Sequence, residues 1–234
     1  MPIEAIFFDI GDTLVTDRPT LTDRIIAASD ACGIAYDRDQ LVAAMRRVED
    51  YALEGYVDGA TTDDSNVMLG VATRLLQEVG ASVEDVNRAG ELVVAFAALP
   101  FERVLHPNAL PLIDTLKSRG FKIGVISDWD SALPDLLEGW GVRQRLDGLA
   151  VSEIVGCTKP NPRLFQHALA EAGVDGAVSI HVGDFYELDI AGARAAGMTG
   201  LLIDVRDRSK NADCPRVTTF DAMADYLLAL PALA

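Results

Sequence analysis

The sequence predicts an α/β fold, a parallel sheet covered by helices on both faces and interrupted by a helical insertion. After residue 104, short apolar segments alternate with amphipathic helical segments, which is typical of a parallel sheet. A separate apolar segment lies at residues 5–14, close to the N-terminus. The chain between these two regions shows helical spacing and little strand pattern. We therefore expect the first strand to be separated from the rest of the sheet by helices.

The first apolar segment runs directly into an acidic residue. Residues 5–8 are apolar, Asp9 follows them, and Gly11 comes two residues later. A continuous apolar run is typical of a strand that is covered on both faces. In open α/β sheets, ligands bind at the carboxyl ends of such strands. Asp9 is therefore a candidate nucleophile or metal ligand, although an Asp after a strand can also cap a turn.

The insertion is expected to contain four amphipathic helices. Apolar residues recur at helical spacing in residues 21–33, 41–55, 67–80 and 82–100. Ser82, with Asp85 three residues later, has the spacing of a helix N-cap. The Met, Phe and Tyr residues of this region are expected to pack in a small core of the insertion rather than to contact a cofactor.

The remainder of the chain alternates strands with helices. Strands are expected at residues 121–126, 146–151, 178–182, 200–205 and, more weakly, 217–220. Helices are expected at residues 107–120, 133–137, 162–172, 187–196 and 222–230. Polar residues follow two of these strands, at Ser127, Asp128 and Asp184. Because the carboxyl ends of parallel strands share one edge of a sheet, we expect these side chains to meet Asp9 there.

The charge of the chain argues against several classes of partner. The formal net charge is −16, from 36 acidic and 20 basic residues. Binding to nucleic acid depends on clustered Lys and Arg, so we expect no nucleic-acid partner, and the same charge argues against anionic membranes. A small phosphorylated substrate remains compatible with this charge if a metal or a lysine supplies positive charge in the site itself.

Other features of the sequence are consistent with a cytoplasmic protein. The N-terminus lacks the basic flank and apolar segment of a signal peptide, and no apolar run reaches the length of about 20 residues that spans a membrane. The three cysteines are far apart and lack metal-ligand spacing, which indicates reduced thiols. The sequence leaves open whether the protein is a monomer or a homodimer.

The loops at the expected sheet edge bring together residues suited to phosphoryl transfer. They carry Asp9, the Ser127 hydroxyl, the Lys159 amine, and the carboxylates of Asp184 and Asp189. Carboxylates and backbone carbonyls are hard oxygen ligands that suit Mg²⁺. A metal and a lysine beside an aspartate favour its ionised form, and an ionised aspartate can attack phosphorus to give an aspartyl-phosphate. Ser127 and the backbone amide of Asp128 are candidates for binding a phosphoryl oxygen.

Four segments, in this order, resemble the motifs of the haloacid dehalogenase superfamily of hydrolases. They are residues 8–14 around Asp9, residues 125–128, residues 157–162 around Lys159, and residues 181–198, which begin His-Val-Gly-Asp. The resemblance implies a Rossmann-like catalytic core at residues 1–16 and 104–234, with a helical cap of the C1 type at residues 17–103. It is strongest to the branch of haloacid dehalogenase-like hydrolase domain-containing proteins.

The resemblance also implies roles for individual residues. It makes Asp9 the nucleophile and Lys159 a second catalytic residue, with Ser127 and Asp128 binding the substrate. It places Mg²⁺ on Asp9, the Gly11 carbonyl, Asp184 and Asp189. The activity implied is Mg²⁺-dependent hydrolysis of a small phosphate ester.

One position departs from the usual phosphatase pattern. That pattern has a second Asp two residues after the nucleophile, which acts as general acid and base, and here the position is Gly11. Asp12 is one residue further on, and the alternation of a strand would turn its side chain away unless a local bulge brought it in. Positioned acid–base groups contribute about 10²–10⁴-fold to rate. We therefore expect a slow phosphatase, or one restricted to good leaving groups such as aryl or acyl phosphates.

Three alternatives use the same residues differently. A metal-independent 2-haloacid dehalogenase needs no second Asp, because halide leaves unprotonated, but the Asp184 and Asp189 pair would then be idle. A phosphonatase-like enzyme needs a Schiff-base lysine in the cap, and there is no lysine between Thr16 and Leu105. A non-catalytic binding protein on the same fold would keep the metal ligands without turnover.

Overall fold

The computed structural model of the chain describes residues 2–57 and 65–232, and within these ranges the side chains of all residues except 46, 49–57 and 65. The chain divides into two compact units. The first, called the core unit here, comprises Met1–Thr16 and Leu105–Ala234, and the second, the helical unit, comprises Asp17–Val104. The expected fold class, a parallel α/β sheet with a helical insertion, is confirmed.

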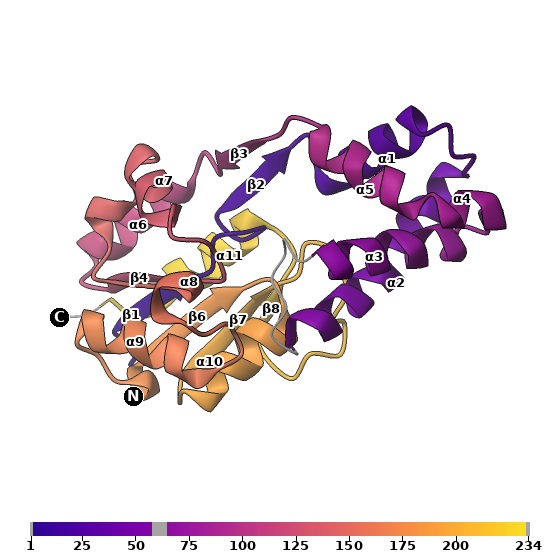
Figure 1. Ribbon diagram of the computed structural model, residues 1–234. Coiled ribbons are helices and arrows are strands. Elements are labelled where there is room, and N and C mark those ends of the chain that lie inside the picture. The colour runs from indigo at the N-terminus through magenta and orange to yellow at the C-terminus, as the bar shows by residue number, and fades with distance from the viewer. Residues whose placement is uncertain (1, 58–64, 233–234) are drawn as a thin grey trace. The chain divides into compact units, whose positions relative to one another are not determined.

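The core unit is built on one six-stranded sheet (Figure 1). The order of strands across it is β5-β4-β1-β6-β7-β8, so β1 lies between β4 and β6, and each strand pair is parallel. The last residue of β1, Phe8, is opposite Val125 of β4 and Val182 of β6. The strands are Ala5–Phe8 (β1), Lys122–Ser127 (β4), Gly148–Val151 (β5), Ser179–Gly183 (β6), Thr199–Ile203 (β7) and Arg216–Val217 (β8).

Helices cover both faces of this sheet, and the alternation of side chains along the strands explains why. In β1, Ile6 and Phe8 belong to an apolar cluster with α6, α7 and α11, whereas Ala5 and Phe7 pack with α9 and α10. Because every β1 side chain meets a helix, the strand is apolar throughout and fully buried. The helices are Ala109–Ser118 (α6), Leu133–Gly139 (α7), Ser152–Val155 (α8), Pro162–Ala172 (α9), Ala191–Ala195 (α10) and Phe220–Leu228 (α11).

Three short non-α helices complete the core unit, and one of them differs from expectation. Arg143–Arg145 (η1) and Gly176–Val178 (η2) are 3₁₀ turns, whereas Tyr186–Ile190 (η3) is a π-helix that leads directly into α10. The sequence predicts an ordinary helix at residues 187–196. A π-helical turn adds one residue to each hydrogen-bonded ring, and such turns are frequent at functional sites.

The part of the helical unit that the structure describes, residues 17–57 and 65–104, contains five helices. Two small apolar clusters hold it together, one formed by α1, α3 and α5 around Leu76 and one formed by α2 and α3 around Leu75. Met45 and Phe96 belong to these clusters, as expected of packing residues. The helices are Leu21–Ala31 (α1), Arg38–Val57 (α2), Ser65–Glu78 (α3), Val83–Asn87 (α4) and Ala89–Ala98 (α5).

Several local details of the expectation are wrong. The segment 82–100 forms two helices because Arg88 leaves the helical conformation between them, although Ser82 caps α4 and accepts a hydrogen bond from Asp85 N as expected. Two short strands, Val15–Arg18 (β2) and Glu102–Leu105 (β3), pair where the chain enters and leaves the insertion, and their sequences gave no strand signal. The weak final strand is only Arg216–Val217, because Thr219 caps a helix that starts at Phe220.

A membrane-spanning segment was not expected. Within residues 2–57 and 65–232, no helix combines the length and the apolar character that crossing a bilayer requires.

Candidate active site

Asp9 lies at the carboxyl end of the central strand. It follows β1 directly, and its backbone N–H continues the sheet by donating to Val182 O of β6 at 2.8 Å. The chain then turns tightly, because Ile10 O accepts hydrogen bonds from the backbone N–H groups of Leu14 (3.0 Å) and Val15 (2.9 Å). This turn ends the strand and presents the buried Asp9 carboxylate at the sheet edge.

Two groups, one at the end of β4 and one on the loop before α9, bind the Asp9 carboxylate. The Ser127 hydroxyl at the end of β4 donates to Asp9 Oδ1 at 3.1 Å, and Lys159 Nζ donates to the same oxygen at 2.7 Å. Both hydrogen bonds that the described residues donate to the Asp9 carboxylate reach Oδ1, so Oδ2 accepts none from them. Burial raises the pKa of Asp9, and Lys159 opposes that effect.

Lys159 is shared between two carboxylates. Its Nζ lies 2.7 Å from Asp9 Oδ1 and 2.7 Å from Asp189 Oδ1, and all three side chains are buried. Burial disfavours a charged amine, yet the carboxylates around it raise the pKa of Lys159 well above its usual value. Lys159 therefore carries a full positive charge beside the candidate nucleophile.

Asp189 comes from the π-helix η3, and all its oxygens are in use. Oδ1 accepts from Lys159 Nζ and lies 2.9 Å from His181 Nε2, while Oδ2 accepts from Phe185 N at 2.9 Å. Burial alone would raise the pKa of Asp189, but Lys159 and His181 hold it well below its usual range. Gly183 makes room for this carboxylate, because a Cβ there would lie 2.1 Å from Asp189 Cγ.

Asp184 follows β6 and lies in the same acidic cluster. Burial raises its pKa well above the usual value, and the negative charges of Asp189, Asp9 and Asp12 add to that effect. Arg208 opposes it by donating from Nη2 to Asp184 Oδ2 at 3.2 Å. Three buried carboxyl groups, those of Asp9, Asp184 and Asp189, therefore surround one buried amine, that of Lys159, and a bound cation would favour their ionised forms.

Asp12 and Gly11 lie in the turn after β1. Asp12 has a φ of 49°, a left-handed conformation that Asp tolerates, and its Oδ2 pairs with Arg206. Because β1 ends at Phe8, the alternation of a strand does not govern the direction of the Asp12 side chain. There is room for a side chain at position 11, since a Cβ on Gly11 would meet nothing within 4 Å.

Asp128 lies beside Lys159 as well. Its Oδ1 accepts a hydrogen bond from Lys159 N at 3.0 Å, which ties the end of β4 to the loop that carries the lysine. Burial raises the pKa of Asp128 to about 6, against the opposing effect of the Lys159 charge. The side chain thus orients the Lys159 loop, in addition to the substrate-binding role predicted for its backbone amide.

The donor set at this edge fits a small divalent cation. Asp9 Oδ2 and Asp184 Oδ1 accept no hydrogen bond from the described residues, and the Gly11 carbonyl lies in the turn that follows Asp9. No group of three or more His, Cys, Asp or Glu side chains among the described residues is arranged to hold a metal. Mg²⁺ is commonly bound by one or two carboxylates and keeps several waters, so it suits such a sparse set.

Two parts of the site were missed by sequence reasoning. The sequence assigns no role to His181, which lies inside an expected strand, but its ring contacts Asp189. The signal was available, because residues 179, 181 and 183 are polar or Gly and share one face of an otherwise apolar strand. Arg206 and Arg208 were also missed, although they follow β7 at the same sheet edge as the other polar residues.

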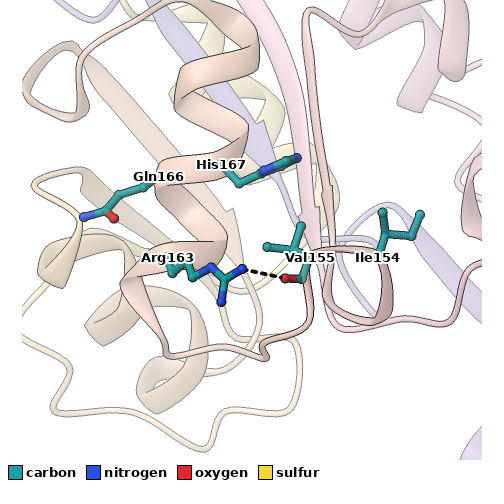
Figure 2. A pocket seen from close by; sticks show the side chains of 5 residues that line it. All are labelled: Ile154, Val155, Arg163, Gln166 and His167. Atoms are coloured by element: carbon teal, nitrogen blue, oxygen red, sulfur yellow. Dashed lines mark hydrogen bonds between the residues drawn. The ribbon is translucent and has the colours of Figure 1, made fainter.

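A surface hollow elsewhere in the core unit contains none of these residues. Figure 2 shows it between α8 and α9, with Arg163 Nη2 donating to Val155 O at 3.3 Å. Its lining consists of Ile154, Val155, Arg163, Gln166 and His167.

Comparison with known proteins connects this geometry to a family. A family model described as haloacid dehalogenase-like hydrolase matches residues 3–197. The mouse haloacid dehalogenase-like hydrolase domain-containing protein 3 is 30% identical over 201 residues, which cover 84% of this chain and 80% of that protein. A glyceraldehyde 3-phosphate phosphatase of Methanothermobacter thermautotrophicus is 35% identical over 223 residues, which cover 86% of each chain. The solved structure of a protein named HAD-hydrolase YfnB from Bacillus subtilis, bound to magnesium, has a TM-score of 0.66 at 18% identity, covering 97% of this chain and 99% of that one.

Proposed function

The chain belongs to the haloacid dehalogenase-like hydrolase family, and we propose that it is a Mg²⁺-dependent phosphatase that hydrolyses a small phosphate monoester through an aspartyl-phosphate on Asp9. The observation that carries this proposal is the position of Lys159, whose Nζ lies 2.7 Å from Asp9 Oδ1 in a buried site. A cation held at this distance keeps an aspartate available as a nucleophile and balances charge on a phosphoryl group. The relative named as a phosphatase supports the choice of a phosphate ester.

The reaction follows from the groups that surround Asp9. A carboxylate oxygen of Asp9 attacks phosphorus, the bond from phosphorus to the leaving-group oxygen breaks, and that oxygen departs with the electron pair. Water then attacks the phosphorus of the aspartyl-phosphate, which releases inorganic phosphate and restores Asp9. Lys159 stabilises negative charge on the phosphoryl oxygens in both steps, and Ser127 holds the Asp9 carboxylate in place through its 3.1 Å hydrogen bond.

The metal would be held by Asp9, Asp184 and the Gly11 carbonyl. When bound, Mg²⁺ supplies positive charge that neutralises a phosphoryl group and the charge that develops during its transfer. We assign Asp189 to the orientation of Lys159, because its two oxygens already accept hydrogen bonds from protein groups.

The leaving group is expected to limit the range of substrates. Gly11 offers no proton donor, and Asp12 is paired with Arg206. A substrate whose leaving group needs no protonation, such as an aryl or acyl phosphate, therefore suits this site better than an alkyl phosphate.

A panel of substrates tests the proposal. Aryl, acyl and alkyl phosphates, together with haloacetates, are assayed with Mg²⁺ and with EDTA, using Asp9→Asn as the control without a nucleophile. Phosphate release that needs both Mg²⁺ and Asp9 is the expected result. Halide release in EDTA would identify a metal-independent dehalogenase instead, and Mg²⁺ binding without turnover of any ester would identify a binding protein.

A further inference from the structure

His181 lies at the end of a series of contacts that begins at Asp9, and it does not contact Asp9 or Lys159 itself. Lys159 links Asp9 to Asp189, and Asp189 Oδ1 lies 2.9 Å from His181 Nε2. His181 is fully buried in β6, where it is opposite Phe7 of β1. Four side chains from four different segments therefore form one continuous chain of contacts.

The neighbours of His181 fix the orientation of its ring. Phe165 of α9 packs edge-on against the imidazole, with ring centroids 5.2 Å apart and an interplanar angle of 85°. Phe165 is itself held closely, because a Cβ at Gly192 would lie 2.5 Å from its ring. The imidazole thus has one direction in which to hydrogen-bond, and that direction is toward Asp189.

The hydrogen bond also fixes which nitrogen carries the hydrogen. An ionised carboxylate only accepts, so Nε2 must donate to Asp189 Oδ1. Nδ1 is buried and has no hydrogen-bond partner among the described residues. A hydrogen on Nδ1 would be a buried donor without an acceptor, so the geometry favours the tautomer with its hydrogen on Nε2.

We propose that His181 is a positioning residue that sets the direction of Asp189 and, through it, the place of the Lys159 amine beside Asp9. This inference rests on the proposed function for its catalytic consequence. The Asp189 carboxylate has Phe185 N on one oxygen and His181 with Lys159 on the other, so loss of the imidazole removes one of three contacts that define its plane. Lys159 would then pair with a carboxylate whose direction is set by two contacts instead of three.

Kinetics of three variants test the positioning role. His181→Leu removes the donor, His181→Gln keeps an amide donor at a similar reach, and Ser179→Ala is the matched control. Ser179 lies in the same strand, is equally buried, and donates to Asp175 O at 2.8 Å, outside the network. We expect His181→Leu to lower kcat for p-nitrophenyl phosphate with Mg²⁺ by about 10–10²-fold, as misplaced catalytic groups do, with KM little changed.

The remaining outcomes separate positioning from packing. His181→Gln should recover most of the lost kcat, and Ser179→Ala should keep the wild-type value. A wild-type kcat in His181→Leu, or equal losses in the Leu and Gln variants, would overturn the proposal.

A spectroscopic measurement decides the same question without turnover. His106 and His167 are the only other histidines, so the imidazole ¹⁵N resonances of His181 are assigned by their loss in His181→Gln. We expect the Nε2–H tautomer in the wild-type protein and a shift of the Nε2 resonance in Asp189→Asn. An Nδ1–H tautomer, or no response to Asp189→Asn, would overturn the proposal. If no ester is hydrolysed at all, the proposed function fails while this measurement still stands.

Discussion

Lys159 and Asp9 form a buried ion pair in which Nζ and Oδ1 are 2.7 Å apart. The same distance separates Lys117 Nζ from Asp147 Oδ2 on the surface of the core unit, where both side chains are about one-third exposed. The two pairs have the same N–O distance but different surroundings. Buried pairs lose much of their hydration, so removing one partner leaves an uncompensated charge, whereas exposed pairs remain solvated.

Replacement of each lysine in turn should show that the buried pair affects stability more than the exposed pair does. We expect Lys159→Met to lower the free energy of unfolding by about 3–5 kcal/mol in EDTA at neutral pH, because Asp9 and Asp189 lose their shared cation. Lys117→Met should change it by less than about 1 kcal/mol. Urea unfolding of both variants measures the difference. Equal effects would mean that the Lys159 network contributes no more than a surface pair.

Replacement of Gly183 tests the position of Asp189 by steric contact rather than by removal of a charge. A Cβ at this position would lie 2.1 Å from Asp189 Cγ, so we expect Gly183→Ala to displace the carboxylate and to abolish phosphatase activity. The overpacking should also cost about 1–3 kcal/mol of stability.

The matched control for this change is Gly139→Ala, at the end of α7. A Cβ there would meet nothing within 4 Å, and Ala is the better helix former. This variant should be as stable as the wild-type protein or slightly more so in thermal unfolding, with full activity. Activity retained in Gly183→Ala would show that Asp189 need not occupy its observed position.

Periodicity predicted the architecture because the inner strands of the core sheet are buried on both faces. The run at residues 5–8 is apolar at every position, and in the structure its side chains pack alternately on α6 with α11 and on α9 with α10. By contrast, β2 contains Asp17 and Arg18 and is largely exposed, so nothing in its sequence distinguishes it from a loop. Its pairing with β3 depends on a contact between segments more than 80 residues apart.

The candidate site was predictable to the extent that it depends on strand ends. Asp9 directly follows β1 and Ser127 is the last residue of the adjacent strand β4, so their 3.1 Å contact could be anticipated from topology. The contact of Asp189 with Lys159 could not, because the π-helical turn η3 sets the direction of the Asp189 side chain and leaves no simple pattern in the sequence. Arg206 and Arg208 lie on a loop after β7, and such a loop has no periodicity from which direction can be inferred.

The absence of a proton donor at Gly11 leads to a gain-of-function prediction. The position accepts a side chain, since a Cβ would meet nothing within 4 Å and its φ is not in the left-handed region. We expect Gly11→Asp to raise kcat for alkyl phosphates by about 10–10²-fold, the lower part of the range for general acids, and to change p-nitrophenyl phosphate turnover much less. Gly11→Asn is the control, because it has the same shape without an acidic proton. A rise in both variants, or in neither, would exclude proton donation as the limit.

Asp128 should make the stability of the protein depend on pH. Burial raises its pKa from 3.8 to about 6 in the folded state, so the fold binds this proton more tightly than the unfolded chain does. The stabilisation that comes from the protonated Asp128 carboxyl is fully present below pH 4 and is lost as the pH rises through about 6. Because about two pKa units correspond to roughly 3 kcal/mol, the stability of the wild type relative to Asp128→Asn should fall by that amount between pH 4 and 7.5.

Urea unfolding across this pH range in EDTA measures the Asp128 effect, with Asp114→Asn as the comparison. The hydrogen bond from Arg145 lowers the pKa of Asp114, so its contribution should have the opposite sign and be lost as the pH falls. If the difference in the free energy of unfolding between the wild-type protein and Asp128→Asn did not change with pH, the Asp128 carboxyl would titrate near its ordinary pKa.

Metal binding should distinguish the two carboxylates of the last motif. We expect Mg²⁺ to raise the melting temperature of the wild-type protein, because a ligand at 100 times its Kd stabilises the fold by about 2.7 kcal/mol. Asp184→Asn should abolish this shift, since Asp184 has a carboxylate oxygen without a hydrogen bond from the described residues. Asp189→Asn should keep most of it, because both Asp189 oxygens accept hydrogen bonds from protein groups. Equal loss in the two variants would make Asp189 a direct ligand, and no shift in the wild-type protein would remove Mg²⁺ from the proposal.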